Sequence, residues 1–368
     1  MTGDRRTEAD RGGQGRTHAA AIRVVFDGLV PPSGARLADV RHHLDTLTKP
    51  PGSLGGLESI AARLACIVGD PPAPLANKVI CVLAADHGVA AEGVSAYPSE
   101  VTAQMCRNYV SGGAAVNAIA GVVGARVVVV DVGVNADLAD VPGLVHRKVR
   151  RGTRNMTRES ALTPDDVLVA LDVGRELLDR ELADADLIGL GEMGIGNTTA
   201  ASALTVGLIG APLDQVVGRG TGIDEAGLER KRHAVRTALE RCADRDPLVL
   251  LTKVGGLEIA AMVGLIIEAA RRHRPVVVDG FITGAAAVVA DALCPPIRHY
   301  LFASHLSAEP GHRVQLEHLQ LKPAIHLDMR LGEGTGAALM FPILDAAGSL
   351  LRNMATFESA GVSGRVGE

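Results

Sequence analysis

The chain has 368 residues, 47% of them hydrophobic and 2% aromatic, and it carries a formal net charge of −5 at pH 7. This acidic balance without tryptophan excludes the basic surface and the aromatic stacking platforms of nucleic-acid-binding proteins. The longest apolar runs fall short of the roughly 20 residues that cross a bilayer, so we expect no nucleic-acid partner, no membrane partner, and small molecules as ligands.

The amino-terminal residues 1–20 mix arginines with acidic residues and glycines, and they lack the continuous apolar segment of a secretory signal. We predict a disordered tail there. The five cysteines are an odd number without CxxC spacing, which indicates neither a disulfide framework nor a zinc knuckle. We therefore expect a reducing, cytoplasmic location.

Residues 37–68 follow as a helical pattern, which is interrupted at 48–56 where Pro50 and Pro51 force an extended break. At the other end of the chain, residues 334–354 form a second long helical pattern. We predict that the two ends meet in a small helical subdomain.

Between them, five short apolar runs ending in Gly, Asp or Ser alternate with longer Ala- and Leu-rich stretches, at 79–84, 126–132, 186–190, 275–278 and 300–303. Such runs predict an α/β fold, a doubly wound and mostly parallel sheet with helices on both faces, in which ligands bind beyond the carboxyl ends of the strands. The predicted organisation is a disordered tail at 1–20, a helical segment of the small subdomain at 21–75, a Rossmann-like α/β domain with the active site at 76–330, the C-terminal helix of the small subdomain at 331–356, and a loose tail at 357–368.

The third run leads into Gly189-x-Gly191-x-x-Gly194, which formally satisfies the dinucleotide fingerprint and leaves a nicotinamide-dependent oxidoreductase as one alternative. Glu192 lies within this string, however, and a carboxylate repels a pyrophosphate. The glycines can also serve only to let the strand and a helix pack closely.

A second glycine loop, residues 218–222, precedes a helix that we expect to be capped by Asp224 and to carry Lys231. Free loop amides and a nearby cation favour phosphate binding over a solvated basic helix face. A catalytically silent nucleotide-binding regulator that uses this loop remains another alternative.

The histidines His87, His305, His312 and His318 show no HxxxH pair and have no cysteine partner, so we expect no metal site. Ser304 and Ser307 lie in no GxSxG elbow, which disfavours acyl transfer.

Near the carboxyl end, Glu333 lies among glycines in the string from 331 to 336. Glycines are poor helix formers and suggest that space is needed around the acid, which suits a general base or an acceptor for sugar hydroxyls. The alternative is an acid that merely complements a helix dipole.

Taken together, these strings resemble the nicotinate-nucleotide:dimethylbenzimidazole phosphoribosyltransferase family, which makes the lower-ligand nucleotide of cobalamin. The resemblance covers about residues 30–355 and is carried by the segments 47–56, 84–89, 93–105, 191–199, 218–222, 279–281, 304–307 and 327–336. Several motifs in the same order are more specific than any one glycine loop.

The resemblance implies transfer of ribose 5-phosphate from nicotinate mononucleotide to 5,6-dimethylbenzimidazole, which gives α-ribazole 5'-phosphate and nicotinate with inversion at the ribosyl carbon. It further implies a homodimer without a cofactor, and it identifies Glu333 as the general base. Substrate-binding residues carried over from the family are Glu192, Asn197, Thr198, Gly220, Thr221, Gly222, Lys231, Ser307 and Arg330 for ribose and phosphate, and Tyr97, Gln104, Met329 and Leu331 for benzimidazole.

Overall fold

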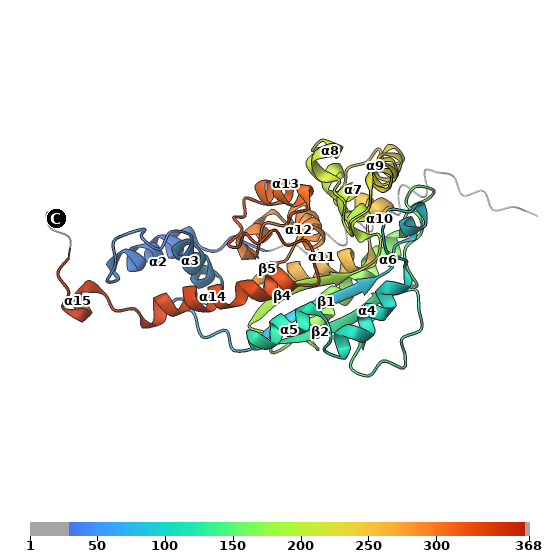
Figure 1. The fold of residues 1–368 in the computed structure, drawn as a ribbon. Coiled ribbons are helices and arrows are strands. Elements are labelled where there is room, and N and C mark those ends of the chain that lie inside the picture. Colours follow the sequence, from blue (N-terminus) through green and yellow to red (C-terminus); the bar gives the residue numbers. More distant parts are fainter. Residues whose placement is uncertain (1–28, 365–368) are drawn as a thin grey trace, which may run out of the picture.

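The computed structural model describes residues 29–364 (Figure 1). The tail predicted at 1–20 and the last four residues of the predicted loose tail lie outside this part. The described part of that loose tail contains one short helix, α15 (Phe357–Ala360).

A six-stranded sheet forms the centre of the molecule, and every pair of neighbouring strands is parallel. Its strand order is β3-β2-β1-β4-β5-β6, so the chain reverses its direction of travel across the sheet between β1 and β4. Open parallel sheets bind ligands at this switch point. The strands are β1 (Lys78–Ala85), β2 (Ala125–Gly133), β3 (Val145–His146), β4 (Leu187–Met193), β5 (Val276–Val278) and β6 (Leu301–Ala303).

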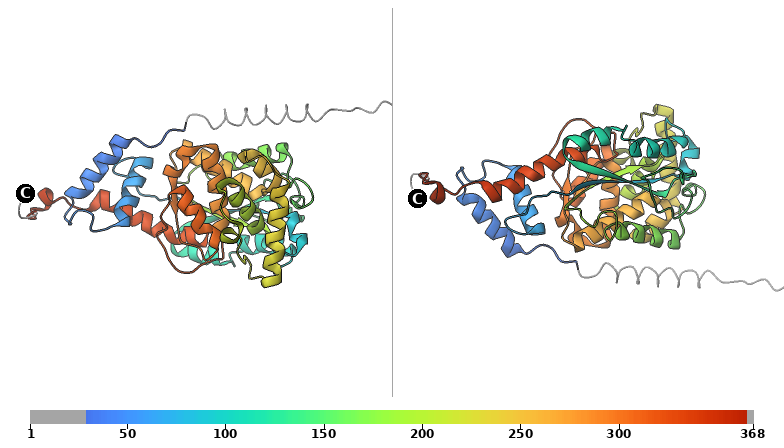
Figure 2. Two further views of the ribbon diagram at one scale, coloured as in Figure 1. Left: turned by 90° about the horizontal axis from the view of Figure 1, so that it is seen from above. Right: turned by 90° about the horizontal axis from the view of Figure 1, so that it is seen from below.

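Helices cover both faces of the sheet, as predicted. One face packs against α4 (Glu100–Val110), α5 (Ala115–Val122) and α14 (Thr335–Asn353), and the other against α11 (Leu257–Arg271) and α12 (Phe281–Leu293) (Figures 1 and 2). The remaining helices are α2 (Gly34–Thr46), α3 (Gly56–Val68), η1 (Gly88–Glu92), α6 (Pro164–Leu177), α7 (Asn197–Ile209), α8 (Leu213–Val216), α9 (Glu225–Glu240), α10 (Pro247–Val254), η2 (Pro295–Tyr300) and α13 (Pro310–Leu319).

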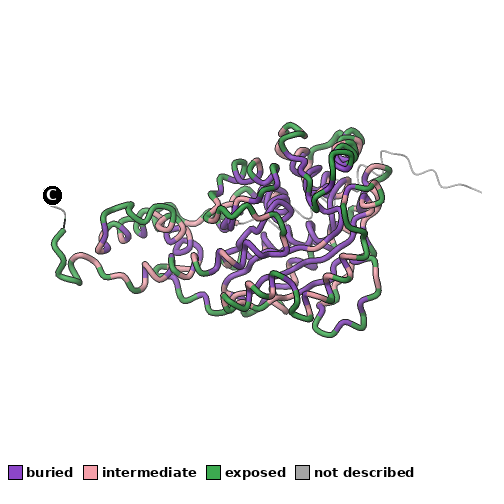
Figure 3. Tube along the Cα trace, in the orientation of Figure 1, coloured by how far each residue is buried: buried purple, intermediate pink, exposed green. Residues whose placement is uncertain are grey.

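The central strands are buried on both faces, which explains their near-continuous apolar sequences (Figure 3). All five predicted strands are present, with their ends displaced by at most three residues. The sequence prediction missed β3, whose two residues pair with Val130 and Asp131 at the sheet edge. A strand of two residues is too short to produce the apolar run or the apolar–polar alternation from which strands are predicted.

The two chain ends meet as predicted. Buried apolar residues of α2, α3 and α14 form their own cluster, separate from the main core, made of Val40, Leu44, Leu47, Ala61, Ala62, Ala65, Ala347 and Leu351. The left side of Figure 1 shows these helices projecting from the sheet. The exact division at residues 75 and 330 stays a prediction. Among the described helices, none combines the length and apolarity needed to cross a bilayer.

Candidate active site

A cavity of about 480 Å³ lies beyond the carboxyl ends of β4, β5 and β6. Glu192 at the end of β4, Gly280 after β5 and His305 after β6 line it, and the amino-terminal end of α14 closes one side with Glu333. The cavity therefore lies at the edge of the sheet where the doubly wound prediction places a ligand.

The loop before α14 holds Glu333 in an unusual backbone conformation. Its φ is +64°, and the flanking Gly332 and Gly334 have φ of +88° and +90°. A non-glycine residue in the left-handed region costs free energy and persists only where its surroundings fix it. Asp279 supplies two of those restraints, because its carboxylate accepts hydrogen bonds from the backbone N–H of Gly334 at 3.1 Å and of Ala337 at 2.9 Å.

The Glu333 side chain is buried at 8% exposure, and its Oε2 has no hydrogen-bond partner in the described structure. Burial raises the pKa of Glu333 above its usual 4.5, while the nearby hydroxyl of Tyr109 on α4 lowers it. A desolvated carboxylate with a free lone pair is a stronger base than one in water. The loop thus presents a basic oxygen at the side of the cavity.

Glu192 lies next to Glu333 but has a different environment. One carboxylate oxygen accepts from the Glu333 backbone N–H at 3.4 Å, and the other accepts from the side-chain amide of Asn197. Burial raises the pKa of Glu192 to about 8, and the charges of Asp279 and Glu258 add to that effect. Glu192 is therefore mostly protonated at neutral pH, whereas Glu333 has the carboxylate oxygen without a hydrogen-bond partner.

Replacing Glu192 with glutamine should make the protein less sensitive to alkaline pH. In the unfolded chain this carboxyl loses its proton near pH 4.5, but in the folded chain it keeps the proton until about pH 8. Rising pH between these values therefore favours the unfolded state, and glutamine removes that contribution. The Tm of Glu192→Gln minus that of wild type should increase from pH 5 to pH 9.

Thermal melts across this pH range test the expectation, with Glu240→Gln as a control because Glu240 is exposed at the end of α9. A Tm difference for Glu192→Gln that does not change with pH would show that Glu192 is already ionised in the folded state.

The glycine loop at 218–222 forms another wall of the cavity. The Thr221 hydroxyl accepts from the backbone N–H of Ala96 at 2.9 Å and contacts Ser95 Oγ at 3.2 Å, which ties this loop to the segment around Tyr97. The amide of Gly220 is not free, as the sequence prediction supposed, because it donates to Glu309 Oε1 at 2.9 Å. The Gly220 amide is therefore bound by the side chain of Glu309, which immediately precedes α13.

Lys231 supports this loop from behind. It is fully buried, and its Nζ donates to Thr198 Oγ1 at 2.8 Å and to the Gly218 carbonyl at 3.1 Å. Burial lowers the pKa of Lys231 to about 8, against the opposing effect of the Glu309 charge. The ammonium thus orients Thr198, which lines the cavity, without lining it itself.

Arg330 is the cation at the cavity surface. Its guanidinium lies 3.4 Å from the Gly220 carbonyl oxygen, and no carboxylate of residues 29–364 pairs with it. Ser307 faces the same region of the cavity. An unpaired guanidinium beside hydroxyl groups is suited to a phosphate.

The chain matches known proteins along almost all of its described length. A family model described as phosphoribosyltransferase matches residues 29–362. A protein of Thermus thermophilus named nicotinate-nucleotide–dimethylbenzimidazole phosphoribosyltransferase is 52% identical over 89% of this chain and 98% of its own length. The chain belongs to the nicotinate-nucleotide:dimethylbenzimidazole phosphoribosyltransferase family.

A protein with the same name from Desulforudis audaxviator is 47% identical over 93% of this chain and 98% of its own length. The crystal structure of a similarly named protein from Thermus thermophilus superposes with a TM-score of 0.85, at 48% identity, and covers 90% of this chain and all of that one. The family prediction and the α/β fold prediction are both confirmed.

The structure brings most of the predicted catalytic and substrate-binding residues to this cavity. Those that line it are Tyr97, Glu192, Asn197, Thr198, Gly220, Thr221, Ser307, Arg330, Leu331 and Glu333. Four others do not, namely Gln104, Gly222, Lys231 and Met329. Gly222 has φ of +95°, so it serves the turn of the loop, while Lys231 acts from behind as described.

Sequence reasoning missed several lining residues. Met105, Met193 and Phe281 add apolar surface, and His305 and Glu309 add polar groups. His305 lies two residues after the predicted strand at 300–303, at the end of the strand where ligands are expected, and this position could have identified it. Glu309 gave no comparable signal, because its partner Gly220 is 89 residues away in the chain.

The dinucleotide alternative is wrong for this chain. Gly189 and Gly191 lie inside β4, and their missing side chains make room for Ile80 and for the Glu333 backbone. The dinucleotide fingerprint also calls for an acid about 20 residues further on to bind the ribose, but the residue there, Asp214 on α8, pairs with Arg232 on α9 at 3.2 Å. The fingerprint glycines thus serve packing, which was the other interpretation.

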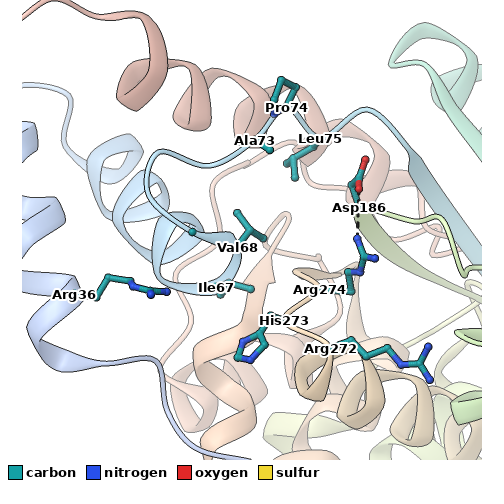
Figure 4. A pocket seen from close by; sticks show the side chains of 11 residues that line it. Arg36, Ile67, Val68, Ala73, Pro74, Leu75, Asp186, Arg272, His273 and Arg274 are labelled. Atoms are coloured by element: carbon teal, nitrogen blue, oxygen red, sulfur yellow. Dashed lines mark hydrogen bonds and ion pairs between the residues drawn. The ribbon is translucent and has the colours of Figure 1, made fainter.

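Another cavity, of about 450 Å³, lies at the opposite ends of the strands (Figure 4). Its arginines are largely neutralised, because Arg274 pairs with Asp186 at 3.4 Å and Arg272 with Asp179 at 2.6 Å. We assign the chemistry to the cavity that holds Glu192 and Glu333.

Proposed function

We propose that this phosphoribosyltransferase moves ribose 5-phosphate from nicotinate mononucleotide to 5,6-dimethylbenzimidazole, and that it releases nicotinate and α-ribazole 5'-phosphate for cobalamin nucleotide-loop synthesis. The names of its relatives support the pair of substrates. The observation that carries the mechanism is the buried Glu333 carboxylate with an unpartnered oxygen at the cavity wall.

The two heterocycles need different help from the enzyme. Nicotinate leaves from a positively charged pyridinium, so its ring departs neutral and requires no general acid. Benzimidazole attacks through one ring nitrogen and must lose the proton from the other. Glu333 accepts that proton as general base, and attack from the face opposite nicotinate converts the β-nucleotide into an α-nucleotide.

The remaining lining residues hold the two substrates. Arg330, Ser307 and Thr221 take the 5'-phosphate, with Lys231 and Gly222 shaping the loop behind them. Asn197, Thr198 and the protonated Glu192 face the ribose and nicotinate side.

The acceptor base has an apolar surface available at the cavity mouth. Tyr97 is 56% exposed and Leu331 57% exposed, although both line the cavity. A flat benzimidazole that covers these two side chains buries apolar area on both partners. Gln104 and Met329 lie in the chain next to lining residues, and we retain them as neighbours of this pocket.

Incubation of the protein with nicotinate mononucleotide and dimethylbenzimidazole tests the reaction directly. Chromatography should detect nicotinate and a ribosylated benzimidazole in equal amounts. A protein that binds the mononucleotide without forming this product would instead be the silent nucleotide-binding regulator.

Replacing Arg330 with methionine should raise KM for nicotinate mononucleotide by about tenfold or more, since a charge-assisted hydrogen bond contributes roughly 1.5–3 kcal/mol. The kcat should change much less, because the phosphate is bound equally in the ground and transition states. Arg219→Met is the matched control, because Arg219 on the same loop already pairs with Glu225 at 2.6 Å. Equal KM values for the two variants would remove Arg330 from the phosphate site.

We also propose a cytoplasmic homodimer, as the family resemblance implies. Light scattering after size-exclusion chromatography measures the mass in solution, and the expected value is twice the chain mass of 38.1 kDa.

A further inference from the structure

His305 lines the cavity, yet the mechanism above gives it no task. It follows β6, its ring is 1% exposed, and it packs against Gly336 in the first turn of α14. Its Nδ1 lies 3.0 Å from Ser304 Oγ. The direction of that hydrogen bond decides what the other ring nitrogen can do.

The Ser304 hydroxyl fixes the tautomer of His305. Ser304 Oγ donates to the backbone carbonyl of Asp279 at 2.8 Å, and a carbonyl can only accept. A hydroxyl has a single hydrogen, so Ser304 has none left for His305. Nδ1 of His305 must therefore be the protonated nitrogen that donates to Ser304. Burial lowers the pKa of His305, which keeps the ring neutral and leaves a lone pair on Nε2.

That lone pair has no partner within residues 29–364 and faces the side of the ring away from Ser304. Nε2 lies about 3.9 Å from where a side chain on Gly280, another lining residue, would begin. The neighbouring His312 behaves in the opposite way, since its Nδ1 accepts from the Ser307 backbone N–H at 3.0 Å and its Nε2 is sealed from the cavity. Of this pair, His305 is the one that offers an acceptor to a ligand.

The chemistry of the donor substrate selects what can bind there, and this step rests on the proposed function. Nicotinate mononucleotide presents a carboxylate and a phosphate, which are acceptors at neutral pH, and two ribose hydroxyls, which are donors. A neutral nitrogen lone pair repels the anions and accepts from a hydroxyl. Ser307, on the phosphate side, is two residues further along the chain. We propose that Nε2 of His305 accepts a hydrogen bond from a ribose hydroxyl of the mononucleotide and thereby selects ribonucleotides.

Deoxy analogues of the substrate test this contact. We would measure kcat/KM for nicotinate mononucleotide and its 2'-deoxy and 3'-deoxy forms with wild type and His305→Ala. The variant should lose about tenfold or more on the natural substrate. The analogue that lacks the contacted hydroxyl should lower kcat/KM of wild type by a similar factor. For His305→Ala, kcat/KM should be the same with that analogue as with the natural substrate. His305→Gln, which can place an oxygen acceptor near the same position, should recover part of the difference.

The design separates a substrate contact from a purely structural role. If His305→Ala and wild type discriminate equally against both analogues, the hydroxyl contact is excluded even where the variant is less active. Calorimetric binding of the three mononucleotides without benzimidazole gives the same comparison when turnover is too slow to measure. His318→Ala, at an exposed histidine on α13 that lies 3.7 Å from Asp291, should keep the wild-type ratios. Absence of ribosylated product with wild type would overturn the proposed reaction, whereas equal discrimination would overturn only the role of His305.

Discussion

Replacing Glu333 with glutamine should lower kcat by about a hundredfold or more, because general-base catalysis contributes roughly 10²–10⁴-fold. Glutamine has the same size and can follow the same left-handed backbone, yet its amide cannot accept the benzimidazole proton. KM for nicotinate mononucleotide should change little, since the phosphate contacts remain. Steady-state kinetics with both substrates, together with a thermal melt, measure these effects separately.

The pH profile gives a second measure of the same residue. Burial raises the pKa of Glu333 above 4.5, so activity should fall on the acid side at a pH above that value, as the carboxylate becomes protonated. This acid limb should disappear in Glu333→Gln. Glu333→Asp keeps a carboxylate but moves it back by one methylene, so its kcat should lie between those of Glu333→Gln and wild type. An undiminished kcat in Glu333→Gln would remove Glu333 from the mechanism.

The sequence was informative where local chemistry decides structure. Apolar runs predicted the five longer strands, Pro50 and Pro51 predicted the break between α2 and α3, and Asp224 was recognised as the cap of α9, where it accepts from the Gly227 N–H. Each of these depends on a few neighbouring residues. The motifs that resemble the family then identified about half of the residues that line the cavity.

The sequence was uninformative where residues far apart compete for one partner. It predicted free amides at 218–222, but Glu309 occupies the Gly220 amide. It also predicted Lys231 beside the phosphate, and it could not show that the ammonium donates hydrogen bonds to Thr198 and to the Gly218 carbonyl. The glycines of β4 look like a phosphate loop because close packing and phosphate binding both require a residue without a side chain. Only three-dimensional neighbours separate the two uses.

Gly191 gives the sharpest test of that packing role, and Gly191→Ala should lower kcat by about a hundredfold. The added Cβ would lie 2.5 Å from the carbonyl oxygen and 2.9 Å from the carbonyl carbon of Glu333. Real Cβ atoms do not approach backbone so closely, and a backbone carbonyl cannot rotate away as a side-chain end can. The loop must therefore move and displace the general base, and a misplacement of about 1 Å in an active site can cost about 10²-fold.

Gly189→Ala is the matched control, because Gly189 lies on the same face of the same strand, two residues earlier. Its added methyl would meet the side-chain ends of Ile80 and Phe341 and, at 3.1 Å, the Cβ of Ala337, but not the Glu333 backbone. Overpacking of this kind costs roughly 1–3 kcal/mol of stability but leaves the base in place. Gly189→Ala should thus melt at a lower temperature with nearly unchanged kcat at a temperature where it is folded. If both variants had the same kcat, close packing of Gly191 against the Glu333 backbone would not position the catalytic carboxylate, and hydrogen bonds such as those from Asp279 would be sufficient to hold the left-handed loop.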